Sequence, residues 1–393
     1  MKKRIVRQLS FFLCLALSSC GYPSSISSID SVSSSKVSSS ILITRGKYSN
    51  PLTFLNQAGQ EYFVSCADPD VIKGDDGYYY LYCTNTYCEM GNLGMAYDRG
   101  PIFRSNDLLS WTWTGSVFQG HNEDGNWGTR GAGVWGPSVI KVGNRYNYYY
   151  ALSTWGDNNP GIGVATSSTP YGPWTHYGKV LDSKDSGVTN SIDPQAIYLD
   201  EQLYLIWGSF YGIACTPLTD DGTEVYYGLD SLKNHIHWLI NDNTVDGEMD
   251  VNSNYEGSYV FQKDNKYYYL GSQGSCCSGI DSTYRVKAGM SDSMFGPYKG
   301  KDGLSLDNKE GTFGELVIGP SKQIAGVGHN TIIQDEEGEF WILYHGYEIN
   351  SEKPNERTAF IDKLLWDDEG YPYVKDQVAS YGADIDGPAV IEI

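Results

Sequence analysis

The sequence predicts an all-β fold, a five-bladed β-propeller, and three observations support this prediction. A strand, a turn and a second, aromatic-rich strand recur five times along the chain. The composition includes 32 tyrosines and 45 glycines, residues that favour strands and tight turns respectively. Segments with helical periodicity are few. One small antiparallel sheet per repeat is typical of a β-propeller, so five repeats predict five blades.

The first repeat spans residues 67–82 and has the pattern of a β-hairpin. Its first strand is short and apolar, its turn contains glycine, and its second strand is rich in tyrosine. This combination indicates a hairpin. Successive repeats begin 57 to 73 residues apart, and the later hairpins span residues 136–153, 193–209, 256–272 and 329–346.

Each repeat opens on a residue that a propeller would place near its central axis. Equivalent positions of successive blades form a ring, so side chains that are distant in sequence meet there. The openers are Asp68, Gly136, Asp193, Glu256 and His329. A single Asp-Pro pair is a common turn dipeptide, but three acids at matching repeat positions predict a catalytic site.

The N-terminal segment predicts export. Residues 1–20 begin with basic residues, continue through a short apolar segment and end at Cys20, which is the pattern of a secretory signal. The apolar segment is too short to span a bilayer. The ending Leu-Ser-Ser-Cys resembles a bacterial lipobox, in which the cysteine is lipidated. We therefore expect an extracytoplasmic protein anchored by lipid at Cys20; ordinary cleavage is the alternative.

Residues 21–40 are interpreted as a flexible tether. Serine occupies 11 of the 17 positions from 24 to 40, and such a segment cannot bury a hydrophobic core. A tail without function is the alternative. Residues 41–393 are expected to form one monomeric propeller domain. Within it, the segment 41–66 is a candidate for the strand that closes the last blade, and residues 229–251 resemble an insertion at a blade edge.

Charge and cysteine content exclude several classes of function. The net charge of −20 argues against nucleic acid as a partner, because its phosphates attract Lys and Arg. The six cysteines outside the signal form no Cys-x-x-Cys pair, so a zinc site is not expected. Disulfides are compatible with export, but their pairing cannot be read from the sequence. A bond between the adjacent Cys276 and Cys277 would demand a strained turn, so we interpret them as a close-packed loop beside the pocket.

Three convergent carboxyl groups suit glycoside hydrolysis. One protonated acid assists departure of the leaving oxygen, and one carboxylate acts on water or on the anomeric carbon. A third acid can hold the catalytic acid in place and raise its pKa through like-charge proximity. Asp68, Asp193 and Glu256 supply this set.

Five motifs in order along the chain carry a resemblance to glycoside hydrolase family 43. They are ADPD at 67–70, WGPS at 135–138, SIDP at 191–194, YEG at 255–257 and GHN at 328–330. Members of that family are five-bladed propellers that invert the anomeric centre. Further motifs resemble its endo-acting α-1,5-L-arabinanase branch: GSCCSG at 274–279, STY at 282–284, GPY at 296–298, YHGY at 344–347 with Arg357, and WDDEGYP at 366–372. The resemblance covers about residues 62–375.

The resemblance implies roles for individual residues. Asp68 corresponds to the general base that activates water, Glu256 to the general acid, and Asp193 to the residue that orients the acid and tunes its pKa. Inversion implies that the base and the acid are roughly 6.5–9.5 Å apart. His329 corresponds to a histidine near a bound cation, usually calcium. Because calcium prefers oxygen ligands, the residues alone favour a hydrogen-bonded pocket histidine.

The resemblance also implies the substrate, and alternatives remain open. Positions that line the arabinose subsites are Trp135, Asn190, Ser209 and Phe210, although Trp135 alone could equally be a core residue. We expect cleavage of internal linkages of arabinan. An exo-acting arabinofuranosidase or β-xylosidase of the same fold is one alternative, and a non-catalytic glycan-binding lipoprotein is another. Gly136 and Ser138 replace the Ala and Asp of many arabinanases, and this departure lies where substrate choice could change.

Overall fold

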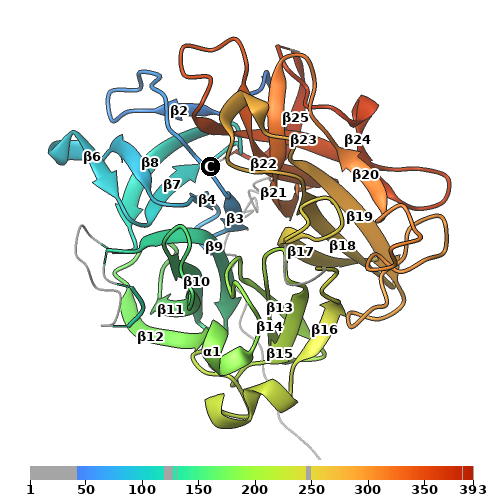
Figure 1. Cartoon of the computed structure of the whole chain (residues 1–393). Coiled ribbons are helices and arrows are strands. Elements are labelled where there is room, and N and C mark those ends of the chain that lie inside the picture. The colour runs from blue at the N-terminus through green and yellow to red at the C-terminus, as the bar shows by residue number, and fades with distance from the viewer. Residues whose placement is uncertain (1–41, 119–126, 130, 245–248, 383, 393) are drawn as a thin grey trace, which may run out of the picture. The chain divides into compact units, whose positions relative to one another are not determined.

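The computed structural model describes residues 42–118, 127–129, 131–244, 249–382 and 384–392. Five sheets surround a central axis (Figure 1), which confirms the predicted five-bladed β-propeller. The predicted signal peptide (1–20), its Cys20 and the predicted tether (21–40) lie outside the described residues. Within the described ranges, no helix has the length and apolar character needed to cross a membrane.

Each blade is an antiparallel sheet whose strands follow one another from the axis outwards. Blade one contains β3 (Asp70–Lys73), β4 (Tyr79–Tyr82), β7 (Pro101–Ser105) and β8 (Ser110–Ser116). Blade two contains β9 (Gly133–Val142), β10 (Arg145–Ser153), β11 (Gly161–Ser167) and β12 (Thr175–Asp182). Blade three contains β13 (Gln195–Leu199), β14 (Gln202–Trp207), β15 (Ile213–Pro217) and β16 (His237–Ile240). Blade four contains β17 (Glu256–Lys263), β18 (Lys266–Gln273), β19 (Arg285–Ser291) and β20 (Glu315–Ile318). Blade five contains β21 (Ile324–Gln334), β22 (Phe340–Glu348), β23 (Arg357–Trp366) and β24 (Pro372–Val374).

The remaining elements are short. A two-stranded ribbon, β5 (Thr86–Glu89) and β6 (Met95–Asp98), follows β4, and β2 (Thr53–Leu55) adds a parallel strand to β8 at the outer edge of blade one. The helices are α1 (Ser183–Ser186), η1 (Gly91–Leu93), η2 (Leu229–Asn234), η3 (Gly279–Asp281) and η4 (Lys375–Gln377). The stretch 229–251 was predicted to be an insertion at a blade edge. It also belongs to the propeller itself, because it supplies β16, the outermost strand of blade three.

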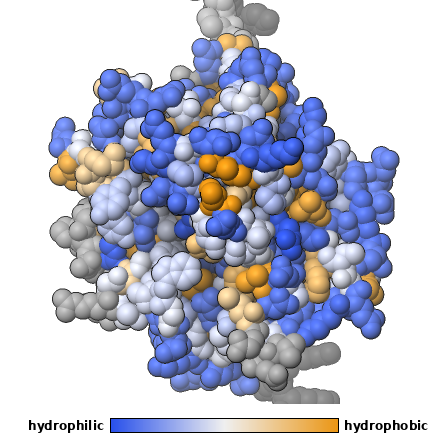
Figure 2. All heavy atoms as spheres, turned by 45° about the horizontal axis from the view of Figure 1, so that its top comes forward, coloured by the Kyte–Doolittle hydropathy of each residue, from blue (hydrophilic) through white to orange (hydrophobic). Residues whose placement is uncertain are grey.

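The hydrophobic core lies between the blades. Five clusters of buried apolar side chains each draw on two neighbouring blades. Tyr148, Tyr149 and Tyr150 are fully buried in two of these clusters. The surface that Figure 2 presents is largely hydrophilic, with apolar residues in small groups.

The backbone shows which residues of the five repeats are equivalent. One residue of each blade, placed near the axis, has a left-handed φ between 48° and 57°: Asp68, Gly136, Asp193, Gly257 and His329. We call these five the axial ring. The predicted opener of blade four, Glu256, is therefore displaced by one residue. It occupies the position that Trp135 holds in blade two, immediately before the ring.

A second ring of residues, two positions further along each inner strand, joins the blades by hydrogen bonds. Three members accept from a backbone N–H: Asp70 from Val139 (2.6 Å), Ser138 from Ala196 (3.2 Å) and Gln195 from Val260 (2.7 Å). Tyr259 donates to Ile332 O (3.2 Å). Thr331 donates to Asp70 Oδ1 (2.8 Å). Each of the first four bonds reaches the backbone of the next blade. The fifth returns to the Asp70 side chain, so the propeller closes through side chains.

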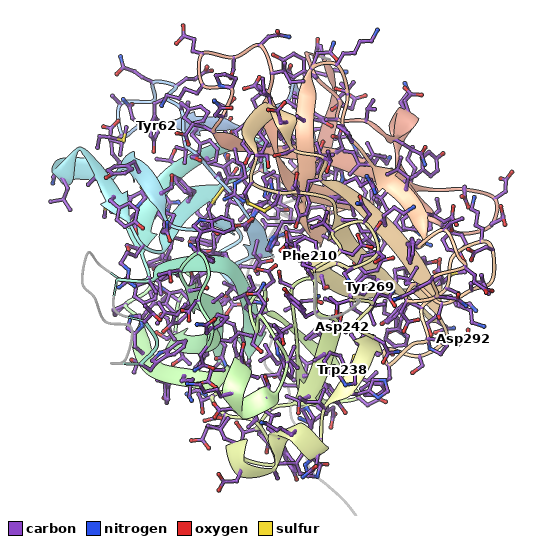
Figure 3. All side chains as sticks on the ribbon, in the orientation of Figure 1. Tyr62, Phe210, Trp238, Asp242, Tyr269 and Asp292 are labelled. Atoms are coloured by element: carbon purple, nitrogen blue, oxygen red, sulfur yellow. A yellow bond between two sulfur atoms is a disulfide. The ribbon has the colours of Figure 1, made fainter. Side chains whose placement is uncertain are left out.

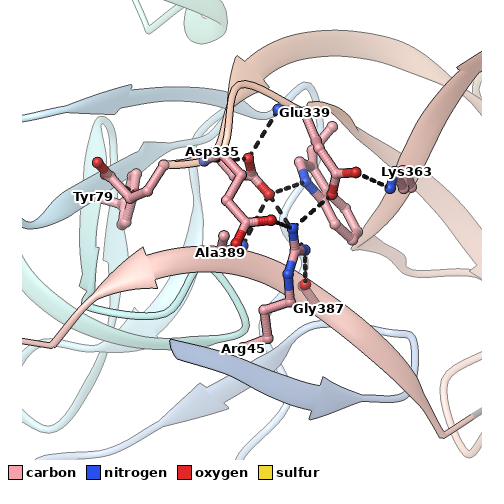
Figure 4. Close-up of polar contacts among 10 residues, drawn as sticks. Arg45, Tyr79, Asp335, Glu339, Lys363, Gly387 and Ala389 are labelled. Carbon is pink, nitrogen blue, oxygen red and sulfur yellow. Dashed lines mark hydrogen bonds and ion pairs between the residues drawn. The ribbon is translucent and has the colours of Figure 1, made fainter. Parts of the chain in front are cut away.

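No strand from the described residues 42–66 joins the sheet of the last blade, contrary to the prediction for the segment 41–66. Asn50 instead exchanges two hydrogen bonds with the backbone of Ile361 at the outer edge of β23. The first strand, β1 (Ile43–Tyr48), pairs with the last, β25 (Ile385–Ile391). Figure 4 shows Arg45 of β1 bonded to Gly387 O (3.0 Å) and to Glu339 (2.8 Å) of blade five. Asp335 accepts from Ala389 N (2.9 Å) in the same cluster.

Replacing Asp70 by alanine is expected to destabilise the fold strongly. The amide of Val139 and the hydroxyl of Thr331 would both lose a buried partner, and each unsatisfied group costs roughly 1–3 kcal/mol. We expect a loss of about 2–5 kcal/mol in the free energy of unfolding, measured by urea denaturation. Asp70→Asn is the matched control, because its oxygen and its NH₂ group can serve the same two partners. A loss for Asp70→Ala no larger than for Asp70→Asn would contradict the closure role.

Candidate active site

Asp68 lies in the axial ring and is held by four neighbours. Its Oδ1 accepts from Arg357 Nη1 at 3.1 Å and lies 3.3 Å from Nδ1 of His329. Thr84 Oγ1 donates to Oδ2 at 2.5 Å, and the backbone N–H of Asp68 donates to Nδ1 of His345 at 3.1 Å. Arg357 is on β23 and His345 on β22, so blade five brings both to the residue that opens blade one.

The pKa of Asp68 lies well below its usual range. Burial alone would raise it, but the Arg357 guanidinium and the nearby His329 and His345 rings outweigh burial. Burial lowers the pKa of His329 and lowers that of His345 to about 4. Both histidines are therefore neutral at neutral pH, and Arg357 is the permanent cation beside Asp68. Asp68 is an ionised carboxylate under these conditions.

Glu256 occupies a different environment at the start of β17. Burial raises the pKa of Glu256 to about 7, although hydrogen bonds from Ser209 and Tyr284 oppose the increase. Ser209 Oγ donates to Glu256 Oε2 at 2.7 Å, and Asn190 Nδ2 donates to Ser209 Oγ at 2.9 Å. The structure thus places two of the predicted substrate residues, Asn190 and Ser209, in a hydrogen-bonded chain that ends on the predicted acid.

Asp193 lies beside Glu256. Its Oδ2 accepts from the backbone N–H of Gly257 at 3.1 Å, and this bond fixes the carboxyl next to the residue that follows Glu256. Burial, together with the charges of Glu256 and Asp68, holds the pKa of Asp193 well above its ordinary value. The site therefore combines one ionised carboxylate, Asp68, with two buried carboxyl groups that retain protons more readily.

The other predicted residues lie around this centre. Trp135 is half-buried, and its ring centroid is 5.8 Å from that of Trp155, whose side chain is 79% exposed. Phe210 is buried and adopts a left-handed φ of 58°. In Figure 3, Phe210 lies near the centre of the propeller, whereas Trp238 of β16 lies further out.

The described side chains do not by themselves form a calcium site. In the part of the chain that the structure describes, no three His, Cys, Asp or Glu side chains are grouped to hold a metal ion. The Nδ1 of His329 faces Asp68, whereas calcium takes six to eight oxygen ligands. Calcium at His329 therefore stays a prediction from the family resemblance.

Three residues of the site had no predicted role: Arg357, His345 and Tyr284. All three lie in motifs that carry the family resemblance, but these motifs did not indicate a chemical role for the three residues. The ring of Tyr284 stacks on that of His345, with centroids 5.7 Å apart. The sequence does contain a signal for His345, because its place in its hairpin matches that of Thr84 in blade one. Both residues contact Asp68.

The structure pairs four of the cysteines. Cys66 and Cys83 form a buried disulfide. Cys276 and Cys277 are also bonded to each other, so the interpretation of these neighbours as a merely close-packed loop was wrong. Cys88 and Cys215 are buried thiols.

Replacing Ser209 by alanine is expected to raise the pKa of Glu256. The hydroxyl of Ser209 stabilises the ionised carboxylate, so its loss favours the protonated form. The alkaline limb of the kcat/KM profile should move to higher pH by about one unit. Ser258→Ala is the control, since this buried serine bonds Tyr269 instead of Glu256. An unchanged alkaline limb in Ser209→Ala would show that Glu256 does not control it.

Comparisons with known proteins agree with the fold. The sequence profile described as "Glycosyl hydrolases family 43" matches residues 63–372. The extracellular exo-α-(1→5)-L-arabinofuranosidase ArbA of Cellvibrio japonicus is 28% identical over 308 residues, which cover 73% of this chain and 84% of that protein. The arabinan endo-1,5-α-L-arabinosidase A of Aspergillus niger is 28% identical over 297 residues, covering 71% of this chain and 81% of that protein.

A solved structure is similar over most of the chain. The structure of the Cellvibrio cellulosa α-L-arabinanase complexed with arabinohexaose superposes with a TM-score of 0.65 and 26% sequence identity. The match covers 79% of this chain and 95% of that chain.

Proposed function

Because the chain belongs to glycosyl hydrolase family 43, we propose that it hydrolyses internal α-1,5-L-arabinofuranosyl linkages of arabinan with inversion of configuration. The observation that carries the proposal is the contrast between two buried carboxyl groups. Asp68 is held ionised beside Arg357, and Glu256 has a pKa of about 7. Relatives named as arabinanases and arabinosidases support the choice of substrate.

The proposed mechanism assigns one proton transfer to each of these two residues. Glu256 donates its proton to the glycosidic oxygen as the bond from that oxygen to the anomeric carbon breaks. Water attacks the anomeric carbon from the opposite face and loses a proton to Asp68. Asp193, fixed by the Gly257 amide, is assigned to orient Glu256 and tune its pKa. The two carboxyl groups interact so that ionisation of one disfavours ionisation of the other, and the pair therefore retains a proton before the reaction. Solvent then returns both residues to their initial protonation states.

Internal cleavage is proposed over cleavage from chain ends. The relatives include both kinds, with exo action in the name of the Cellvibrio japonicus enzyme and endo action in those of Aspergillus niger and Bacillus subtilis. The test is the early product profile on linear α-1,5-arabinan, with the Glu256→Gln protein as a control for contaminating hydrolases. A ladder of oligosaccharides with rapid loss of viscosity is expected. Arabinose alone would establish exo action, and binding without products would favour a glycan-binding protein.

We also propose that the protein acts outside the cytoplasm, anchored at Cys20. Two disulfides among the described residues fit an oxidising compartment, and two of the relatives are named extracellular. The anchor rests on the sequence motif. Metabolic labelling with a fatty acid should modify the wild-type protein and leave Cys20→Ala unlabelled. Equal labelling of both would exclude this anchor. The isolated propeller is proposed to be a monomer, which light scattering tests.

Calcium binding at His329 is a separate proposal that rests on the family resemblance alone. If the ion binds there, metal analysis of the purified protein should find calcium, and chelation should lower the melting temperature of the wild-type protein. His329→Ala should contain no calcium and show no response to chelation. Calcium retained by His329→Ala would place the ion elsewhere.

A further inference from the structure

The predicted base lies where the hydrogen-bond ladder of its blade is short. In blades two, four and five, the inner hairpin ladder extends to the axial ring and beyond, with pairs such as Trp135–Ala151 and Glu256–Ser272. In blade one, the ladder between β3 and β4 ends at the pair Asp70–Tyr82. Asp68 lies just outside it. The ladder therefore does not hold Asp68 in the way that it holds Trp135 and Glu256.

The Cys66–Cys83 disulfide spans this gap. Cys66 lies two residues before Asp68, and Cys83 lies immediately before Thr84. Both cysteines are fully buried. Thr84 bonds the segment twice, through its amide to Ala67 O (3.0 Å) and through its hydroxyl to Asp68 Oδ2 (2.5 Å). The disulfide thus joins the two chain segments whose side chains meet at the predicted base.

Blade three provides an internal comparison. Its ladder also begins two residues after the axial ring, at the pair Gln195–Ile206, and its ring residue is Asp193. There, the repeat positions of Cys66 and Cys83 are occupied by Ser191 and Trp207, and Trp207 Nε1 donates to Ser191 Oγ at 3.1 Å. Both blades with short ladders and an axial aspartate are therefore cross-linked at the same two positions, one covalently and one by a hydrogen bond.

We infer that the Cys66–Cys83 disulfide is a positioning element for Asp68, an inference that rests on the proposed role of Asp68 as the base. Without the disulfide, a single backbone hydrogen bond joins the residues before Asp68 to the segment that follows β4. It runs from the amide of Thr84 to Ala67 O. The contact between Thr84 and Asp68 then loses its fixed geometry. A displacement of about 1 Å at a catalytic group can cost 10²-fold in rate.

The test is a double-mutant cycle with the Cys66→Ala/Cys83→Ala variant. We expect kcat to fall by roughly 10- to 100-fold with KM nearly unchanged, because the base acts in the transition state. In an Asp68→Asn background, removing the disulfide should cause no further loss, since the effect acts through Asp68. The control Cys215→Ala removes a buried sulfur from blade three, and it should leave kcat unchanged. Equal losses of kcat in the presence and absence of Asp68 would overturn the inference.

A second measurement does not depend on hydrolysis. Hydrogen exchange at residues 66–70 and at Gly136, whose amide bonds Thr84 Oγ1 at 3.0 Å, should accelerate in the disulfide variant. Exchange in β13 and β14 of blade three should remain unchanged. If the alanine pair does not fold, Cys66→Val with Cys83→Ala restores volume, as Val134 does at the same position of blade two. Unchanged exchange around Asp68 would contradict the inference, whereas a wild-type protein inactive on arabinan would contradict only the proposed function.

Discussion

Replacing Glu256 by glutamine is expected to lower kcat on arabinan by about 10³-fold, because the leaving oxygen loses its proton donor. The amide keeps the shape of the side chain and can still accept from Ser209, so binding of substrate should change little. The alkaline limb of the kcat/KM profile should disappear, since that limb reports deprotonation of Glu256. Steady-state kinetics across pH measure both effects.

The leaving group provides the control for Glu256. An aryl arabino-oligosaccharide with an acidic phenol needs little protonation as its bond breaks. Glu256→Gln should therefore lose far less activity on the aryl substrate than on arabinan. Equal losses on the two substrates would exclude Glu256 as the proton donor.

Replacing Asp68 by asparagine is expected to cost about 10³-fold or more on both substrates, because the attacking water loses its base whatever the leaving group. The substitution also leaves the buried Arg357 without its carboxylate partner. Arg357→Ala is the informative companion variant. It should move the acid limb of the kcat/KM profile to higher pH by raising the pKa of Asp68, since the guanidinium is the main charge that lowers that pKa.

Small anions separate a missing base from a damaged fold. Azide is a nucleophile that needs no base, and Asp68→Gly leaves room for it. Azide should accelerate this variant and have no effect on wild type or on Glu256→Gln with arabinan. Absence of rescue in Asp68→Gly, with an intact melting transition, would count against Asp68 as the base.

The repeat pattern in the sequence was sufficient to predict the number of blades and the meeting of distant residues at the axis. The position of Glu256 was predicted one residue away from its true register. Alignment of the three acids places Glu256 in the axial ring. Alignment of the apolar residue three positions after each ring member places Gly257 there instead. Val71, Val139 and Val260 mark Asp68, Gly136 and Gly257 as equivalent, and the left-handed backbone of all three agrees.

The contacts of the site were less predictable, for a physical reason. Arg357 reaches Asp68 from β23, the third strand of the last blade, and nothing in a sequence states which way a strand residue points across a blade interface. The same limit applies to the pair Cys66–Cys83, which only the folded hairpin brings together. The strained turn that adjacent cysteines require argued against a bond between Cys276 and Cys277, but the structure forms this bond.

The stereochemistry of hydrolysis tests the central claim most directly. Proton NMR identifies the anomer that is released first from an α-1,5-arabino-oligosaccharide. The enzyme concentration must be high enough for hydrolysis to be faster than mutarotation. General-base attack by water through Asp68 on the face opposite Glu256 predicts that the β-anomer appears first. Initial release of the α-anomer would mean that configuration is retained, and the assignment of Asp68 and Glu256 to a single-displacement reaction would then be wrong.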